Sequence, residues 1–345
     1  MNQSTLTPFE IQKSLATGGW NPNIYLTNVS VAEFQQPDDF VAYKVFPIVL
    51  VQLPTSKFYK FSKADLARST MAEKPTFGTV SPTQWASDTD DYCVKVYQGI
   101  WGVDQISGLT YQRSGALGAA NPMIGKAKVA AEQTKLFMDI MFAQKFFKAG
   151  VWANEYAGKT SNISGNQFYQ FDNANSDPVS FIHGLIRDMK KGGRRKANKL
   201  SLGANTFTAL MNNEAIKERV KYGGTTTNPA TVNEKVLAEL FGVDEVLVLE
   251  STYNKAAQGQ AENMDYICDA NGALLTYTPN SAAIDEPSAG YIFTWDMLGN
   301  GQPMAVTNFL GQPGTHSEFV EALCSFDMKQ VSKDLAVYLS DCTSK

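Results

Sequence analysis

The sequence predicts an α+β fold, and three observations lead to that prediction. One long helix is expected over residues 125–149, where apolar residues recur at steps of three and four. Strand-like runs lie on both sides of it, within residues 45–97 and 291–339. Between them, residues 178–249 alternate helical and strand-like stretches, which is typical of a compact α/β unit.

The long helix is predicted to carry an apolar face and a charged face. The apolar face contains Val129, Gln133, Leu136, Phe137, Ile140 and Phe147. The charged face contains Lys128, Glu132, Lys135 and Asp139, where opposite charges become neighbours. At 1.5 Å per residue the helix would be roughly 37 Å long. Globular helices average about 11 to 12 residues, so we expect this one to brace an extended structure.

Residues 1 to about 40 have weak periodicity and are expected to form an extended arm without a core. Apolar residues of the arm, including Trp20 and Tyr25, would then need partners outside it. A strand is expected over residues 40–53.

A projecting hairpin is predicted from strands at residues 57–63 and 92–97, joined by a long polar loop. Both faces of the first strand mix aromatic and charged side chains, so neither is a plain core face. A lone two-stranded hairpin is marginal in water. We therefore expect Phe58, Tyr59 and Phe61 to be buried against another subunit.

The rest of the chain is predicted to alternate helices with strands. Helices are expected at 178–191, at 206–222 with a break near Asn212 and Asn213, and at 233–241 before Gly242. Strands are expected at 199–202, 245–249, 291–295, 304–309, 319–326 and 334–339, with a hairpin of 264–268 and 273–277 around Asn271-Gly272.

Composition limits the class of protein. An apolar fraction of 43% and a charged fraction of 19% suit a folded chain, and a net charge of -4 argues against a protein that mainly coats nucleic acid. No apolar run is long enough to cross a membrane, and residues 1–5 do not resemble a signal peptide, so a cytoplasm is expected. The four widely spaced cysteines are expected to be reduced and mostly buried.

No catalytic, cofactor-binding or metal-binding motif is found. Gly118 to Lys126 resembles a phosphate loop, but its spacing is two residues too long and Ala127 stands where Ser or Thr must bind magnesium. Asp88, Asp90 and Asp91 are interpreted as a solvated loop tip, because no Glu follows at the spacing of a calcium loop. An enzyme is therefore disfavoured.

One basic stretch stands out, with Lys190, Lys191, Arg194 and Arg195 as its candidate contact residues and Lys196 and Lys199 beyond them. One interpretation is a solvated helix C-terminus, where cations suit the helix dipole. The other is a contact to DNA or to an acidic neighbour. No aromatic residue interleaves the cations, which favours the first interpretation.

The order of these parts resembles the major capsid proteins of tailed bacteriophages with the Hong Kong 97-type fold. Matching stretches are Lys44–Pro47 followed by Phe58–Phe61, Trp152 after the long helix, Asn198–Gly203 before a helix, and Leu237–Asn254. The resemblance implies five parts. These are an N-terminal arm (1–45), an extended hairpin loop (46–100), a peripheral domain with a spine helix (101–177, helix 125–149), an inserted axial α/β domain (178–300) and returning peripheral strands (301–345).

The resemblance also implies a function. It predicts a protein that self-assembles into pentamers and hexamers of an icosahedral head, located in the virion and assembled in the host cytoplasm. Implied partners are other copies of the chain, packaged double-stranded DNA, a portal and possibly a decoration protein, with no membrane. Alternatives are an encapsulin-like shell that stores cargo and a two-domain enzyme. Because only about 40 residues precede the first strand, we expect a separate scaffolding protein and no trimming of this chain.

Overall fold

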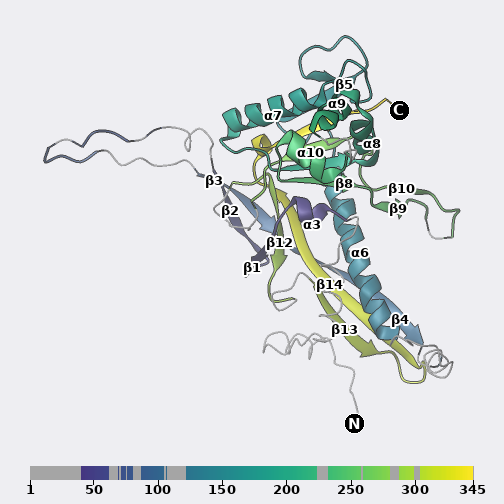
Figure 1. The fold of residues 1–345 in the computed structure, drawn as a ribbon. Coiled ribbons are helices and arrows are strands. Elements are labelled where there is room, and N and C mark those ends of the chain that lie inside the picture. Colours follow the sequence, from purple (N-terminus) through teal and green to yellow (C-terminus); the bar gives the residue numbers. More distant parts are fainter. Residues whose placement is uncertain are drawn as a thin grey trace. The chain divides into compact units, whose positions relative to one another are not determined.

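The computed structural model describes residues 40–61, 69, 71–74, 76–80, 87–104, 106, 122–223, 232–257, 259–279, 287–298 and 304–344. The chain divides into two compact units (Figure 1). Among described residues, unit 1 comprises Lys95–Thr134 and Trp295–Phe326. Unit 2 comprises Pro37–Val94, Lys135–Thr294 and Asp327–Lys345. The division falls inside one helix and two strands.

The described helices are α3 (Ala42–Val45), α6 (Pro122–Lys145), α7 (Pro178–Gly193), α8 (Ala204–Asn212), α9 (Glu214–Gly223), α10 (Glu234–Phe241) and η1 (Lys333–Leu335). The strands are β1 (Ile48–Val51), β2 (Thr55–Phe61), β3 (Ser87–Cys93), β4 (Lys95–Asp104), β5 (Asn154–Lys159), β6 (Gln167–Tyr169), β7 (Lys199–Gly203), β8 (Glu245–Leu249), β9 (Thr252–Asn254), β10 (Met264–Tyr266), β11 (Ala273–Thr276), β12 (Gly290–Trp295), β13 (Met304–Leu310), β14 (Ser317–Gln330) and β15 (Ala336–Ser340).

A six-stranded mixed sheet forms the centre of unit 2, in the order β6-β5-β15-β11-β7-β8. Strand β15 is parallel to β5, and β7 is parallel to β8, whereas β11 is antiparallel to both of its neighbours. The two central strands therefore come from distant parts of the sequence. Residues beyond 300 complete a sheet whose other strands lie between residues 154 and 276.

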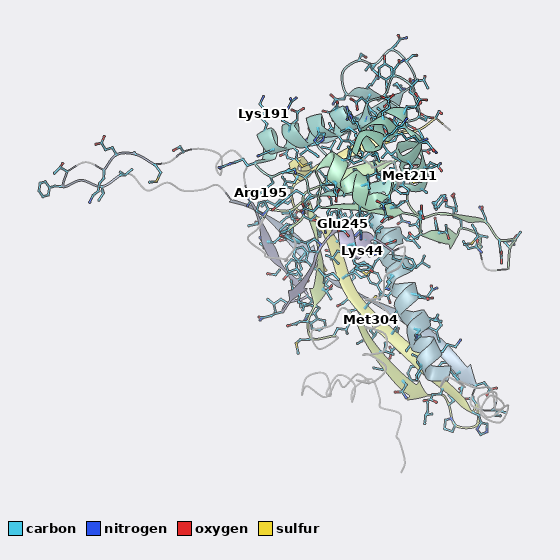
Figure 2. All side chains as sticks on the ribbon, viewed as in Figure 1. Lys44, Lys191, Arg195, Met211, Glu245 and Met304 are labelled. Atoms are coloured by element: carbon cyan, nitrogen blue, oxygen red, sulfur yellow. The ribbon has the colours of Figure 1, made fainter. Side chains whose placement is uncertain are left out.

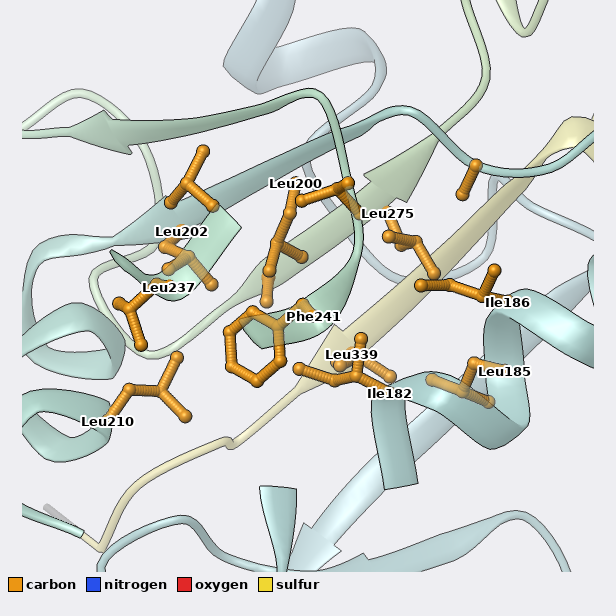
Figure 3. Packing of buried hydrophobic residues seen from close by; sticks show 14 of the residues in the cluster. Ile182, Leu185, Ile186, Leu200, Leu202, Leu210, Leu237, Phe241, Leu275 and Leu339 are labelled. Carbon is orange, nitrogen blue, oxygen red and sulfur yellow. The ribbon is translucent and has the colours of Figure 1, made fainter. Parts of the chain in front are cut away.

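Helices α7, α8 and α10 bury their apolar faces on this sheet (Figure 3). Ile182 of α7, Leu210 of α8 and Phe241 of α10 are fully buried with Leu200 and Leu202 of β7. Successive side chains of a strand point to opposite faces of the sheet, so Tyr338 of β15 and Leu339 lie on different faces. On the face away from these helices, the Tyr338 ring packs edge-on against Phe147, with ring centroids 5.5 Å apart.

Local signals set the ends of these helices as predicted. Asp177 caps α7 by accepting a hydrogen bond from the Ser180 N–H, and Asn233 caps α10 by accepting one from the Val236 N–H. Gly242 ends α10 in the left-handed conformation with φ 67°. The predicted break in residues 206–222 is confirmed, because α8 ends at Asn212 and α9 begins at Glu214.

A long helix is confirmed as α6, but it spans Pro122–Lys145 rather than residues 125–149, and its predicted faces are wrong. Val129 and Gln133 are exposed, while the buried face of the helix consists of Ala127, Ala130, Ala131, Thr134, Lys135, Met138, Asp139 and Phe142. These residues also recur at steps of three and four. Alanine and threonine lower the hydrophobicity of this stripe, and two buried charges interrupt it, so the sequence pattern pointed to a neighbouring face.

In unit 1, strands β4 and β13 both pair antiparallel with β14. Cross-strand aromatic pairs support the pairing, with Phe309 stacked on Phe319 at 5.3 Å and Tyr97 packed on Phe326 at 4.9 Å. In unit 2, the last residues of β14 pair with β12 instead. The predicted strands at 291–295, 304–309 and 319–326 are confirmed.

Two predicted strand assignments are wrong. Residues 40–47 do not form a strand, because Ala42–Val45 make the helical turn α3 before β1 begins at Ile48. Asn271-Gly272 does form a turn, with the Gly272 N–H donating to the Asp269 carbonyl at 3.1 Å. The flanking strands do not pair with each other, because β10 pairs with β9, and β11 pairs with β15 and β7.

The four cysteines are free thiols, and three of them are buried as expected. Burial raises the pKa of the Cys324 thiol to about 11, so this thiol is protonated at neutral pH. Cys93, at the end of β3, is exposed.

Candidate functional site

A hairpin exists as β2 paired with β3, but its second strand is Ser87–Cys93 and not the predicted residues 92–97. Residues from Lys95 onward belong to β4, which pairs with β14. The base of the hairpin also has a core of its own. Phe58 is 3% exposed, and its ring centroid lies 5.4 Å from that of Phe293. Tyr92 of β3 stacks on the same ring at 4.6 Å. The expectation that neither face has a core is therefore wrong. Phe58 is buried within its own chain, because β12 supplies an aromatic partner that the sequence pattern did not reveal.

For the other predicted contact residues, the structure describes at most the backbone. Tyr59 and Phe61 lie opposite Thr89 and Ser87 in the β2–β3 ladder, but their side chains are outside the described residues, as are Trp20 and Tyr25. Between the strands, Lys60 forms an ion pair with Asp90 at 2.5 Å. The hydrogen bond from Lys60 holds the pKa of Asp90 below its usual value, so this cross-strand pair is charged at neutral pH.

The loop between β2 and β3 carries exposed apolar side chains that the sequence analysis passed over. Phe77 is 105% exposed and Met71 is 91% exposed. Phe77 also has a positive φ of 62°, in a turn that Gly78 follows. A fully exposed aromatic side chain of this kind is a candidate contact for another molecule. The available signal was an aromatic residue within a loop otherwise rich in polar residues, proline and glycine.

We expect truncation of Phe58 to destabilise the protein strongly and truncation of Phe77 to have almost no effect on its stability. Phe58→Ala should lower the free energy of unfolding by about 3 kcal/mol, because it leaves a cavity against Phe293. Phe77→Ala should change it by less than about 0.5 kcal/mol, because no buried contact is lost. Urea unfolding of the unassembled chain measures both. Equal losses in the two variants would contradict this assignment.

The helical turn α3 is held at its start by Asp139, which lies on α6 and is 1% exposed. Its carboxylate accepts hydrogen bonds from the Ala42 N–H at 2.9 Å and the Val41 N–H at 3.3 Å. It also accepts one from the Ser251 hydroxyl at 2.9 Å. A charge predicted on the helix surface therefore caps a distant helix and ties three segments of unit 2 together.

The end of α3 is held by a cation. Lys199 at the start of β7 donates from its Nζ to the carbonyl oxygen of Lys44. The last carbonyls of a helix lack partners within it, and a cation suits that end. Burial lowers the pKa of Lys199, opposed by the nearby carboxylates of Glu245 and Asp244. Lys199 therefore does not belong with the exposed basic stretch that precedes it.

The other cations of the predicted basic stretch lie at the end of α7 and in the turn after it (Figure 2). Lys190 and Lys191 occupy the last helical turn, and Arg194 ends the helix in the left-handed conformation with φ 58°. Arg195 lies over the ring of Tyr277 at 5.8 Å. We call the exposed residues Lys190, Lys191, Arg194, Arg195 and Lys196 the basic end.

The described part of unit 2 contains an open hollow with polar and carboxylate side chains. An open hollow of about 320 Å³ lies between Phe171–Ser176 and Ala209–Ala215, lined by Asp172, Asn213 and Glu214 among others. Its described lining residues include no His, Cys, Lys or Arg to serve as nucleophile or base. Within the described ranges, no three His, Cys, Asp or Glu side chains could jointly hold a metal ion. The helices that the structure describes are too short or too polar to span a membrane.

Known structures share this architecture. A phage-related protein from Bordetella bronchiseptica RB50 superposes with a TM-score of 0.69, covering 93% of this chain and 97% of the other at 14% identity. The putative capsid protein of a prophage of Escherichia coli CFT073 superposes with a TM-score of 0.52, covering 92% and 96% at 11% identity. The chain has the fold of phage capsid proteins.

A sequence relative agrees with this capsid fold. The major capsid protein of Burkholderia phage BcepMu is 30% identical over 150 residues, which is 40% of this chain and 43% of that protein. The aligned region thus spans less than half of the relative. No family model matches the chain. The resemblance to phage major capsid proteins, inferred above from the order of the parts, is confirmed by the capsid fold and by this relative.

Proposed function

We propose that the chain is a phage major capsid protein that self-assembles into the pentamers and hexamers of an icosahedral head around double-stranded DNA. The observation that carries the proposal is the capsid fold over more than nine-tenths of the chain, together with the partial match to a major capsid protein. The protein would then be a virion component with a structural rather than an enzymatic role.

The exposed loop between β2 and β3 supports assembly. Met71 and Phe77 present apolar surface that water solvates poorly, and the part of the chain that the structure describes does not cover them. Another copy can bury them, because aromatic side chains dominate interface energetics. This loop corresponds to the extended loop (46–100) of the Hong Kong 97-type arrangement, which we adopt together with the arm (1–45), peripheral (101–177, 301–345) and axial (178–300) parts.

The test is electron microscopy of the purified protein, with a variant that removes the apolar loop contacts. Wild type should form shells of uniform size. Met71→Ser/Phe77→Ser should keep the wild-type circular dichroism and melting temperature of the unassembled chain, since both side chains are exposed. Its yield of shells should fall at least about tenfold, by analogy with hot-spot aromatics at interfaces.

A matched control is Ile163→Ser, which removes an exposed apolar side chain elsewhere in unit 2 and should leave shell yield unchanged. Small discrete particles from wild type would overturn the proposed function. Particles that contain a specific co-purified protein and no DNA would instead identify an encapsulin-like compartment. Normal shells from the double variant would show that the loop is not an intersubunit contact.

A further inference from the structure

Two exposed elements of opposite charge lie at opposite ends of one pair of parallel strands in unit 2. The pair is β7 and β8, in register from Lys199 with Glu245 to Gly203 with Leu249. The basic end immediately precedes the first residue of β7. The ribbon β9–β10 follows the last residue of β8 (Figure 1). Parallel strands of five residues separate these ends by about 13 Å, so each element is directed away from the other.

The basic end is rich in cations. Residues 190–196 contain five cations and no acid. Lys190 and Lys191 are exposed in the last turn of α7, where the carbonyl end of the helix favours cations. The guanidinium of Arg195 lies over the ring of Tyr277 at 5.8 Å, which keeps it at the surface of the unit. This surface would attract an anionic partner.

The ribbon and its connections are acidic. Residues 250–269 contain four acids and one lysine. Lys255 is already paired with Asp265 across the ribbon at 2.5 Å. Glu250, Glu262 and Asp269 are exposed.

The ribbon also lacks cover. Its three residue pairs form a separate two-stranded sheet, which is marginal on its own in water. Met264 is 59% exposed and Tyr266 is 37% exposed. Exposed apolar side chains on a ribbon that Glu250 and Glu262 precede in sequence suit a partner that supplies cations together with aliphatic surface, such as lysine and arginine side chains.

We propose that the β9–β10 ribbon of one copy binds the basic end of the next copy. The two elements cannot meet within one chain, because they lie at opposite ends of the same strands. Between copies they form a head-to-tail contact, and such a contact produces a ring when the rotation closes. The proposal rests on the proposed function and specifies one contact of its rings. A nucleic acid partner for the basic end would leave the acidic ribbon without a role.

A charge exchange tests the contact. Lys190→Glu/Lys191→Glu lowers the net charge of residues 190–196 from +5 to +1, and Glu250→Lys/Glu262→Lys changes that of residues 250–269 from -3 to +1. Each double variant therefore weakens the attraction between the two elements and should lower shell yield at least tenfold at physiological salt. The fourfold variant exchanges the signs at the same four positions, so it restores opposite charges where Lys190 and Lys191 face Glu250 and Glu262 and should recover part of the yield. Lys148→Glu/Lys159→Glu, which changes exposed lysines elsewhere, should assemble like wild type. Melting temperatures of the unassembled chains check that every variant folds.

The outcomes separate the alternatives. Wild-type yield from both double variants, or no recovery in the fourfold variant, overturns the contact while shell formation by wild type keeps the proposed function. Normal shells that lose DNA only with Lys190→Glu/Lys191→Glu assign the basic end to nucleic acid and also overturn the contact. Failure of wild type itself to form shells overturns the proposed function.

Discussion

Replacing Asp139 with alanine is expected to lower the free energy of unfolding by about 3 to 5 kcal/mol. The substitution removes the acceptor of the Val41 and Ala42 N–H groups and of the Ser251 hydroxyl, all of them buried. A buried donor left without a partner costs about 1 to 3 kcal/mol. Urea unfolding with a fixed slope measures the loss, and α3 should be the first segment to gain amide exchange.

Two further variants of α6 serve as controls for Asp139→Ala. Asp139→Asn retains one side-chain oxygen and should lose roughly half as much, because the amide nitrogen cannot accept a hydrogen bond. Glu132→Ala removes an exposed carboxylate from the same helix and should stay within about 0.5 kcal/mol of wild type. A loss below about 1 kcal/mol for Asp139→Ala would falsify the capping role.

Removing the residues from Asp341 onward should prevent unit 2 from folding stably. Cys342 is fully buried, its N–H donates to the Asn271 carbonyl at 2.8 Å, and its carbonyl accepts from the Phe171 N–H at 2.8 Å. The Gln170 side chain donates to the carbonyls of Asp341 and Thr343, each at 3.1 Å. At about 1 kcal/mol per hydrogen bond plus the buried side chain, the loss is about 5 kcal/mol, comparable with the whole stability of a domain.

A shorter deletion and a point variant test the same segment. Removal from Ser344 onward keeps Cys342 in place and should cost about 1 kcal/mol. Gly158→Ala should be severe, because its Cβ would lie 2.0 Å from the Asp341 carbonyl oxygen and one backbone segment must move. A soluble chain truncated at Ser340 with the wild-type melting temperature would contradict the role assigned to residues 341–343.

Sequence reasoning succeeded where the signal and the structure are both local. Pro178, Asn233 and Gly242 mark helix ends through their own backbone preferences, and the structure has helix ends at these residues. The apolar run at residues 245–249 identified β8 because a strand buried on both faces needs no alternation. These features require no knowledge of what packs against them.

The misassigned elements depend on distant partners. Helix α3 has only four residues and is capped by Asp139 and Lys199, which lie about 100 and 155 residues away in the chain. Asn271-Gly272 turns the chain as its sequence predicts, but β11 is a central strand and finds better partners in β7 and β15. Local pattern cannot reveal such competition.

The same distinction applies to the candidate surfaces. The alternation in β2 identified an amphipathic hairpin, but only the fold reveals that Phe293 covers Phe58 and that the exposed aromatic group is Phe77. The sequence shows that residues 190–199 are rich in Lys and Arg. Only the structure shows that Lys199 has a different role, because its Nζ donates to the carbonyl oxygen of Lys44. The acidic ribbon was missed because its charges are dispersed over about 20 residues of sequence.

The central position of β15 has a consequence for how the protein is made. Its parallel partner β5 precedes it by about 180 residues, and every other strand of that sheet is translated earlier. A nascent chain therefore holds β5 and β11 with open edges until the ribosome has passed residue 340. Unpaired strand edges can pair with other chains and cause aggregation, so we expect the need for chaperones to be greatest in this interval. Prematurely terminated chains lack the strand that joins the two halves of the sheet and are left to proteolysis.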